Sequence, residues 1–183
     1  MQWKNLSSPR QKKARQSKSK FKAMLIFFFD IWGIVRVDWI PEGQTLNQVC
    51  YKEVLTNLRE RVRRRRRPEM WKNSSWVLHQ DNAPAHNALS VKTFLTKHKI
   101  TMLKHPPYSP DLATCDFFLF PKINSALKGT RFQSVDAVKA KATELMNKLS
   151  EDDLKHCFQQ WKICMERCRF WGGEYIEGDV SIV

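Results

Sequence analysis

The chain has 183 residues, of which 42% are apolar, a composition that supports one domain with a sizeable core and excludes an intrinsically disordered protein. Its net charge is +14 and its pI about 9.8, a balance typical of proteins that bind nucleic acid or another polyanion. Two segments carry this excess: residues 1–22 hold eight Lys or Arg and no acidic residue, and residues 59–67 hold seven Arg and one Glu. Contacts with a polyanion are therefore expected from these two segments.

The cysteines and the apolar runs narrow the class further. Five cysteines are an odd number without paired spacing, which favours reduced thiols in an intracellular protein. Cys157, Cys164 and Cys168 with His156 leave a zinc site open as an alternative, although their spacing also suits one buried helix face. The apolar run 23–29 is far shorter than the roughly 20 residues that cross a bilayer, so no membrane partner is expected.

The first part of the chain reads as an arm, a hairpin and a helix. Residues 1–22 predict a flexible basic arm, and residues 22–29 predict a buried strand. An alternating strand over 34–40 follows a short turn, so the two strands predict a β-hairpin. Residues 45–68 have apolar side chains at helical spacing and predict an amphipathic helix that ends near Pro68. Its apolar face consists of Tyr51, Val54, Leu55, Leu58 and Val62.

Short strands alternate with helices in the rest of the chain. The predicted elements are a strand over 76–78, a helix from Pro84, a strand over 100–103, a stiff proline-rich loop over 105–110, and helices beginning at Asp116 and spanning 135–149 and 152–170. A hairpin followed by this alternation predicts an α/β fold, a mixed sheet with flanking helices.

Two aspartates, each at the end of a segment that reads as buried structure, carry the most specific signal. Asp81 lies in the motif Leu-His-Gln-Asp-Asn-Ala-Pro-Ala-His, and Asp116 follows the motif His-Pro-Pro-Tyr-Ser-Pro-Asp-Leu, with residues 82–115 between the two carboxylates. Carboxylates so placed can hold a divalent metal, because hard cations prefer anionic oxygen ligands. Both motifs resemble the catalytic domain of mariner-family transposases. The resemblance around Asp116 covers residues 105–122, and it extends to three further segments, 24–35, 41–45 and 170–178.

The resemblance implies an RNase H-like fold in which three aspartates bind two divalent metals, Mg²⁺ or Mn²⁺, for DNA cleavage and strand transfer. By position Asp81 matches the second catalytic and metal-binding aspartate, and Asp116 matches the third. The family's first aspartate lies in a Gly-Asp-Glu motif on a strand that precedes the matched segment. We therefore expect a domain truncated at its N-terminus, which lacks the first, central strand of the sheet.

Each candidate residue also has a plain structural alternative. Asp81 and Asp116 could cap the helices that follow them, and Asp111 reads as a turn residue. His79 and His86 flank the site and could touch phosphate, but hydrogen-bonded structural roles are favoured. The arginines of residues 59–67 could contact phosphate or form a solvated helix end. The candidate nucleic-acid-binding residues are Arg59, Arg61, Arg63, Arg64, Arg65, Arg66, Arg67, Lys12, Lys13, Arg15, Lys18 and Lys20.

The resulting hypothesis is a mariner transposase-derived, nuclear DNA-binding protein. It divides into the arm 1–22, a partial catalytic domain 23–171 and a loosely ordered tail 172–183. DNA binding is expected to be non-specific and salt-sensitive, with a homodimer as a further partner and no small-molecule substrate. Catalysis is not expected, because the first aspartate is missing. Two alternatives stay open: a residual metal-dependent DNA endonuclease or strand-transfer activity, and an interaction module whose sheet is completed by a partner strand.

Overall fold

The computed structural model describes residues 22–66, 68–72 and 75–170. Its strands are β1 (Met24–Asp30), β2 (Gly33–Ile40), β3 (Val77–His79) and β4 (Thr101–Leu103). Its α-helices are α1 (Gln48–Arg61), α2 (Pro68–Lys72), α3 (Pro84–Asn87), α4 (Leu89–Lys97), α5 (Phe120–Leu127), α6 (Val135–Asn147) and α7 (Glu151–Phe170). Two π-helical segments, η1 (Val62–Arg66) and η3 (Cys115–Leu119), and one 3₁₀ turn, η2 (Pro110–Leu112), complete the order. The tail 172–183 and all of the arm except Lys22 lie outside the described residues.

The predicted hairpin is confirmed. Strands β1 and β2 pair antiparallel, with Met24 opposite Ile40 and Asp30 opposite Gly33. Gly33 closes the turn with a φ of 146°, a backbone conformation that favours glycine. A bulge between Phe28 and Phe29 shifts the register near the turn, as bulges do when an extra residue enters one strand.

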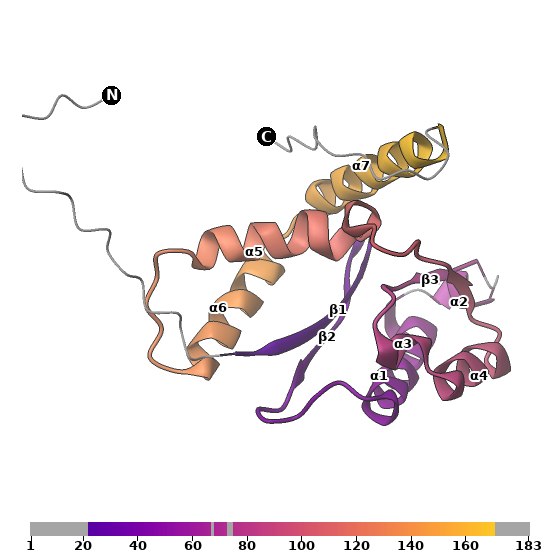
Figure 1. Cartoon of the computed structure of the whole chain (residues 1–183), viewed down its shortest axis with the longest axis horizontal. Coiled ribbons are helices and arrows are strands. Elements are labelled where there is room, and N and C mark those ends of the chain that lie inside the picture. The colour runs from indigo at the N-terminus through magenta and orange to yellow at the C-terminus, as the bar shows by residue number, and fades with distance from the viewer. Residues whose placement is uncertain (1–21, 67, 73–74, 171–183) are drawn as a thin grey trace, which may run out of the picture.

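The hairpin separates two hydrophobic clusters, because successive side chains of a strand point to opposite faces. On one face, Ile26 and Phe28 pack with α1, α4 and Leu78 of β3. On the other face, Phe27 and Phe29 pack with η3, α5, α6 and the first turns of α7. Figure 1 shows this arrangement, with α5, α6 and α7 on one side of β1 and β2 and with α1, α3 and α4 on the other. The fold is therefore a three-layer α/β arrangement.

The sheet is divided in two. Strand β3 pairs with β4 in parallel, and β1 pairs with β2, but the described strands form no ladder between β1 and β3. A cavity of about 140 Å³ lies between them, lined by Phe28 and Phe29 of β1 and by Val77 and Leu78 of β3, among others. The two pairs, one antiparallel and one parallel, agree with the expected mixed sheet with flanking helices.

Helix α7 bridges the two half-sheets on one face. The ring centroids of Phe29 and Phe158 are 5.7 Å apart, those of Phe158 and Trp161 5.9 Å, and those of Trp161 and His79 5.1 Å. Strands β1 and β3 are thus linked through aromatic side chains of α7 although their backbones do not pair. Side-chain packing, rather than backbone hydrogen bonding, holds the two halves together here.

Local signals explain where the long helices begin. The side chain of Asn47 accepts hydrogen bonds from the backbone N–H groups of Val49 and Cys50 at the start of α1. At the start of α7, Ser150 and Asp153 form reciprocal bonds: Ser150 Oγ accepts from the Asp153 N–H, and Asp153 Oδ2 accepts from the Ser150 N–H, both at 3.0 Å. No helix among the described residues is long and apolar enough to span a membrane.

Two expectations need correction. The helix expected from Pro84 is two helices, because Ala88 has an extended backbone (φ −58°, ψ 142°) between α3 and α4. The long helix expected to end near Pro68 stops being α-helical at Arg61, continues as η1 through Arg66, and is followed by the unpredicted helix α2.

Candidate functional site

Asp81 lies in the turn between β3 and α3, beyond the carboxyl end of β3. Because β3 and β4 are parallel, the loops that follow them leave the same edge of the pair, which brings the Asp81 turn beside the loop after β4. The Oδ1 atom of Asp81 accepts a hydrogen bond from the Ala83 N–H at 3.1 Å and lies 2.5 Å from His86 Nδ1. The His86 bond, more than any other contact, lowers the pKa of Asp81, so this carboxylate stays ionised.

His86 is itself held by a closed set of contacts. The ring centroids of Tyr51 and His86 are 4.0 Å apart, and the Tyr51 hydroxyl donates to Gln80 Oε1 at 2.6 Å. Gln80 Nε2 donates in turn to the backbone carbonyl of His86 at 3.2 Å. Burial, and then the nearby Asp81 carboxylate, raise the pKa of Tyr51, so its hydroxyl remains a donor. Helix α1 therefore orients the imidazole that binds Asp81.

The loop after β4 is fastened to the Asp81 turn by side chains. Asn82 Nδ2 donates to the carbonyls of His105 at 2.9 Å and Pro106 at 3.2 Å. His79 Nε2 lies 3.2 Å from His105 Nδ1, and Trp161 Nε1 donates to the Leu112 carbonyl at 2.9 Å. Burial and then His105 lower the pKa of His79 to about 4, so His79 is neutral at physiological pH.

Asp116 lies on η3, the π-helical segment that precedes α5. Its N–H donates to the Ala113 carbonyl at 2.8 Å, while no hydrogen bond reaches its carboxylate among the described residues. Partial burial and then the Asp81 carboxylate raise the pKa of Asp116. Burial and both carboxylates likewise raise the pKa of Cys115 to about 12. The fold therefore brings Asp81 and Asp116 close enough to repel each other.

The capping alternative fits neither aspartate fully. The N-cap residue of α3 is Ala83 and that of η3 is Thr114, and neither makes a side-chain capping bond. Asp81 does tie down the turn before α3, whereas Asp116 lies inside the first turn of its segment.

The donor set suits a hard divalent cation but is small. Two repelling carboxylates are the oxygen ligands that Mg²⁺ or Mn²⁺ prefers, and Mg²⁺ is often held by only one or two protein carboxylates. Within the described part of the chain, no group of three or more His, Cys, Asp or Glu side chains could hold a metal ion. Asp81 and Asp116 would therefore be the residues that hold such an ion.

The predicted arginine cluster forms around one acidic side chain. Glu60 forms ion pairs with Arg59, Arg63 and Arg64. The Arg59 guanidinium also lies 5.0 Å from the Trp71 ring centroid. A hollow of about 250 Å³ beside it is lined by Arg36, Glu60, Arg61 and Arg64. The side chains of Arg65 and Arg66, and Arg67 with Lys12, Lys13, Arg15, Lys18 and Lys20, lie outside the described residues.

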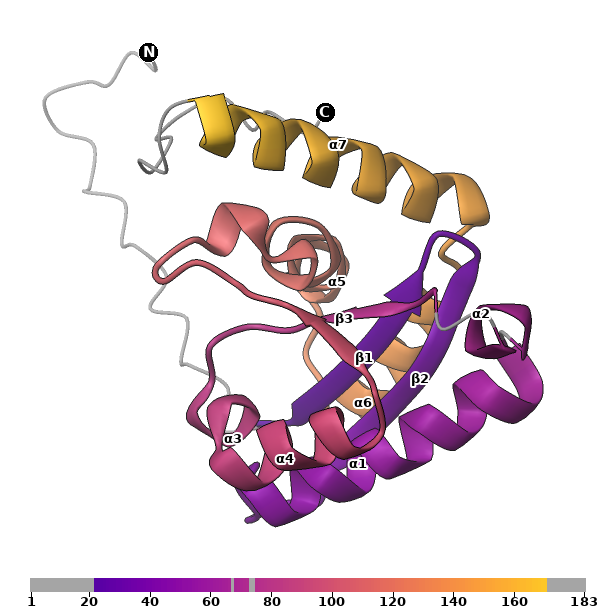
Figure 2. The same cartoon turned by 90° about the vertical axis from the view of Figure 1, so that its right-hand side faces the viewer.

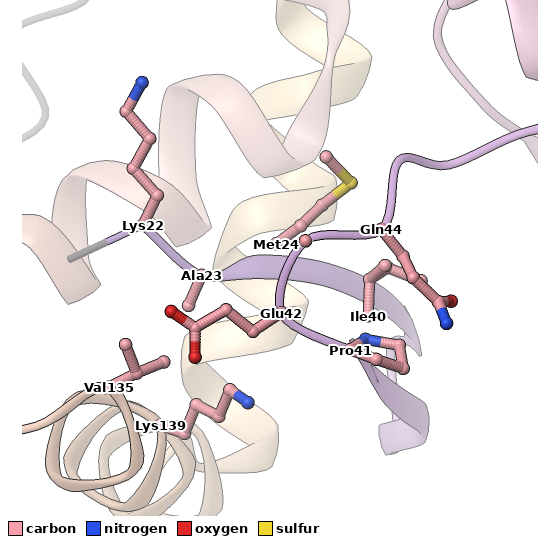
Figure 3. Close-up of a pocket in the computed structure, with 10 residues that line it drawn as sticks. Lys22, Ala23, Met24, Ile40, Pro41, Glu42, Gln44, Val135 and Lys139 are labelled. Carbon is pink, nitrogen blue, oxygen red and sulfur yellow. The ribbon is translucent and has the colours of Figure 1, made fainter.

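A larger hollow of about 570 Å³ lies at the open end of the hairpin (Figure 3), lined by the start of β1, the loop after β2, and Val135 and Lys139 of α6. Lys22, Lys139 and Glu42 supply its charged groups. Because it shares no residue with the aspartate pair or the arginine cluster, it takes no part in either candidate site.

Several residues that build the site were not expected from the sequence. Tyr51 counted only as an apolar position of α1, and Trp161 only as part of the apolar stripe of α7. Gln80 and Asn82 lie inside the aspartate motif, and their amide side chains are the one local signal that pointed to them. His105 was seen only as the start of a spacer loop, because its partner His79 is 26 residues away in the chain.

Comparison with known proteins identifies the family. A family model described as transposase (partial DDE domain) matches residues 1–73. The chain is 32% identical over 170 residues to the mariner Mos1 transposase of Drosophila mauritiana, covering 92% of this chain and 49% of that protein. It is also 24% identical over 149 residues to the human histone-lysine N-methyltransferase SETMAR, covering 79% of this chain and 22% of that protein. The chain thus spans about half the length of the Mos1 transposase.

Solved structures agree. The catalytic domain of Mos1 mariner transposase superposes with a TM-score of 0.76 at 29% identity, covering 85% of this chain and 76% of that one. A pre-cleavage Mos1 transpososome superposes with a TM-score of 0.84 at 29% identity, covering 97% of this chain and 52% of that one. The chain belongs to the mariner transposase family and forms part of its RNase H-like catalytic domain.

Proposed function

We propose that this chain is a transposase-derived DNA-binding protein that binds duplex DNA without sequence preference and does not cleave it on its own. Binding runs through the arginine cluster of residues 59–67 and the basic arm 1–22, and Asp81 and Asp116 hold at most one weakly bound divalent ion. The observation that carries the proposal is the cluster itself, where three arginines surround one glutamate at the end of α1. The solved complexes of the related Mos1 transposase, among them a paired-end complex, support a DNA partner.

The physical basis is phosphate neutralisation. Each guanidinium that pairs with a backbone phosphate releases condensed counterions, so the affinity falls steeply with salt, by about 0.9 in log–log slope per contact. Such contacts position a protein on DNA but read no bases. No sequence preference is therefore expected from the arginine cluster or the arm.

The test is fluorescence anisotropy of a short labelled duplex in EDTA, over a series of NaCl concentrations. Binding that weakens linearly in log Kd against log salt, equally for two unrelated sequences, is the expected result. Absence of binding at the lowest salt, or binding that needs Mg²⁺, would refute the proposal. A nuclear location follows from the same partner and is checked by imaging a tagged chain.

Cleavage is the second candidate function, favoured by the proximity of Asp81 and Asp116. The related Mos1 catalytic domain has been solved with Mg and with Mn. When bound, the metal would activate a water or a 3′-hydroxyl; this chain's carboxylates would hold it, and His86 would keep Asp81 oriented. Mn²⁺-dependent nicking of supercoiled DNA that disappears in Asp81→Ala would establish this candidate over the first.

The divided sheet favours a third candidate, an interaction module completed by a partner strand. The cavity between β1 and β3 and the half-exposed Val77 mark the place where such a strand would enter. Concentration-dependent self-association without affinity for DNA would favour this candidate. Homodimer formation is measured in the same experiment, by sedimentation velocity.

A further inference from the structure

Glu60 organises the arginine cluster through three separate guanidinium groups. Its Oε1 accepts a hydrogen bond from Arg59 Nη1 at 3.0 Å, and its Oε2 accepts one from Arg63 Nη2 at 2.8 Å. The same Oε2 forms an ion pair with Arg64 Nε at 3.0 Å. These three interactions, led by the Arg63 hydrogen bond, lower the pKa of Glu60, which stays ionised. One carboxylate thus restrains three long side chains that would otherwise sample many rotamers.

The arginines around Glu60 differ in what else they contact. Arg59 also stacks over Trp71, and Arg63 is engaged by Glu60. Arg61, in contrast, makes no ion pair with any described residue, and it lines the 250 Å³ hollow together with Arg64 and Arg36. Arg36 is oriented from β2 by a two-bond pair with Asp38. The hollow is therefore lined by the Arg61 guanidinium, by the guanidinium groups of Arg36 and Arg64 that carboxylates orient, and by the Glu60 carboxylate.

We propose that this hollow is a preformed site for a phosphate group of the DNA backbone, with Arg61 and Arg64 as the contacting residues and Glu60 as the positioning residue. The inference rests on the proposed DNA-binding function and deepens it. A planar guanidinium binds a phosphate through two parallel hydrogen bonds, so its orientation matters as much as its charge. Of the two contacting arginines, Glu60 orients Arg64, and it also engages Arg59 and Arg63 of the same cluster.

This assignment makes a prediction opposite to that of charge alone. If only net charge matters, Glu60→Gln adds one positive unit and tightens DNA binding. If Glu60 positions the array, the same change releases the arginines, and binding must reorder them at a cost. Ordering one long side chain costs about 0.5–1.5 kcal/mol, so Glu60→Gln is expected to weaken binding by roughly 2- to 10-fold.

The matched control is Glu53→Gln, which makes the same charge change at an exposed position of the same helix, where the described residues show no ion pair. Anisotropy titrations of one duplex at fixed salt compare the two variants with the unchanged chain. Glu53→Gln is expected to bind equally or slightly more tightly, and Glu60→Gln more weakly. Equal or tighter binding by Glu60→Gln would overturn the proposal.

A second pair of variants keeps the test decisive if Glu60→Gln does not fold. Arg61→Gln is expected to reduce the salt slope by about 0.9, the value for one phosphate contact, whereas Lys52→Gln on the same helix leaves it unchanged. An identical slope in both variants would overturn the assignment of Arg61. Inorganic phosphate is the second probe, added to the complex of the chain with the labelled duplex. If it displaces the duplex at a concentration equal to that of the duplex phosphates, the hollow is a site for a free anion and not for the DNA backbone. If the unchanged chain itself shows no salt-dependent DNA binding, the proposed function fails as well. This result differs from the variant results above, which test only the roles of Glu60 and Arg61.

Discussion

The two aspartates of the candidate site are alike in chemistry but differ in environment. Asp81 is stabilised as an anion by His86 and by the Ala83 N–H, and its pKa is lowered. Asp116 has no such donors among the described residues, and its partial burial, followed by the Asp81 carboxylate, raises its pKa. The fold thus stabilises the charged form of Asp81 and disfavours the charged form of Asp116, a difference that a divalent cation held by both carboxylates would reduce.

Any stabilisation of the fold by a divalent metal should therefore depend on both Asp81 and Asp116. In thermal unfolding followed by circular dichroism, Mn²⁺ at ten times its Kd is expected to stabilise the protein by about 1.4 kcal/mol, or roughly 3–5 °C. Asp81→Asn and Asp116→Asn should each abolish this rise, whereas Asp152→Asn, at an exposed first-turn position of α7, should retain it. In EDTA at neutral pH, Asp116→Asn should melt no lower than the unchanged chain, because the charged form of Asp116 is disfavoured by the fold. A full Mn²⁺ response in either site variant would contradict the assignment.

His79 makes the stability depend on pH. Its pKa is about 4 in the folded chain against an ordinary value of 6.5, so between these values the unfolded chain binds more protons. Its contribution is complete above pH 6.5 and is lost as the pH falls towards 4. Between pH 7.5 and 5 this loss is about 1 kcal/mol once partial exposure is discounted.

The measurement compares unfolding temperatures at these two pH values in EDTA. His79→Gln should narrow the difference by roughly 2–4 °C. His156→Gln, at an exposed position of α7, is the control and should leave the difference unchanged. An unchanged pH difference in His79→Gln would show that this imidazole is not kept neutral by the fold.

At the scale of the elements, the division of the sheet is the main structural liability. Strands β1 and β3 each pair on one side only among the described strands, and Val77 of β3 is 55% exposed. Unpaired strand edges with apolar side chains promote edge-to-edge association. A charged side chain at this edge should therefore reduce self-association.

Val77→Lys is expected to lower the concentration-dependent light scattering of the purified chain without changing its helix content. Val49→Lys is the matched control, because Val49 is 61% exposed but lies on the helix α1 and not on a strand. It should scatter like the unchanged chain. Equal reduction by both substitutions would indicate a general effect of added charge, not an effect of the β3 edge.

The elements that the sequence predicted well are those whose signal is local. The buried residues of α1 recur at helical spacing, and Asn47 supplies its cap, so periodicity and capping agree. The break at Ala88 has no such signal, since alanine is a good helix former and tertiary packing decides its conformation. The π-helical segments at Val62–Arg66 and Cys115–Leu119 likewise have no sequence rule of their own.

The same distinction applies to the candidate site. The two aspartates stood out because their motifs resemble a family, and the bond between Asp81 and His86 spans only five residues. The contacts of Tyr51 with Gln80 and of His79 with His105 join residues 29 and 26 positions apart, so they depend on how α1, β3 and β4 pack. Sequence reasoning could place the carboxylates, but it could not show which side chains orient them.

At the scale of the whole molecule, the hairpin joins the two hydrophobic clusters into one unit. Ile26 belongs to the cluster with α1 and α4, and its neighbour Phe27 belongs to the cluster with α5, α6 and α7. Figure 2 shows β1 and β2 running between these helix layers. Because the same strands line both clusters, neither cluster can lose its packing without disturbing the other. Unfolding should therefore be a single cooperative transition despite the divided sheet.

Two core substitutions test this coupling. Leu55 is 1% exposed in the first cluster and Met146 is 0% exposed in the second, so Leu55→Ala and Met146→Ala should each destabilise the fold by about 2–5 kcal/mol. Each should lower one shared unfolding midpoint, seen identically by circular dichroism and by tryptophan fluorescence, because Trp76 packs on the first cluster and Trp39 on the second. Leu89→Ala, at an 80% exposed position, should leave that midpoint in place. Two separate unfolding transitions, each shifted by only one of the substitutions, would mean that the two hydrophobic clusters unfold independently. The hairpin would then not be sufficient to couple them in the absence of backbone pairing between β1 and β3.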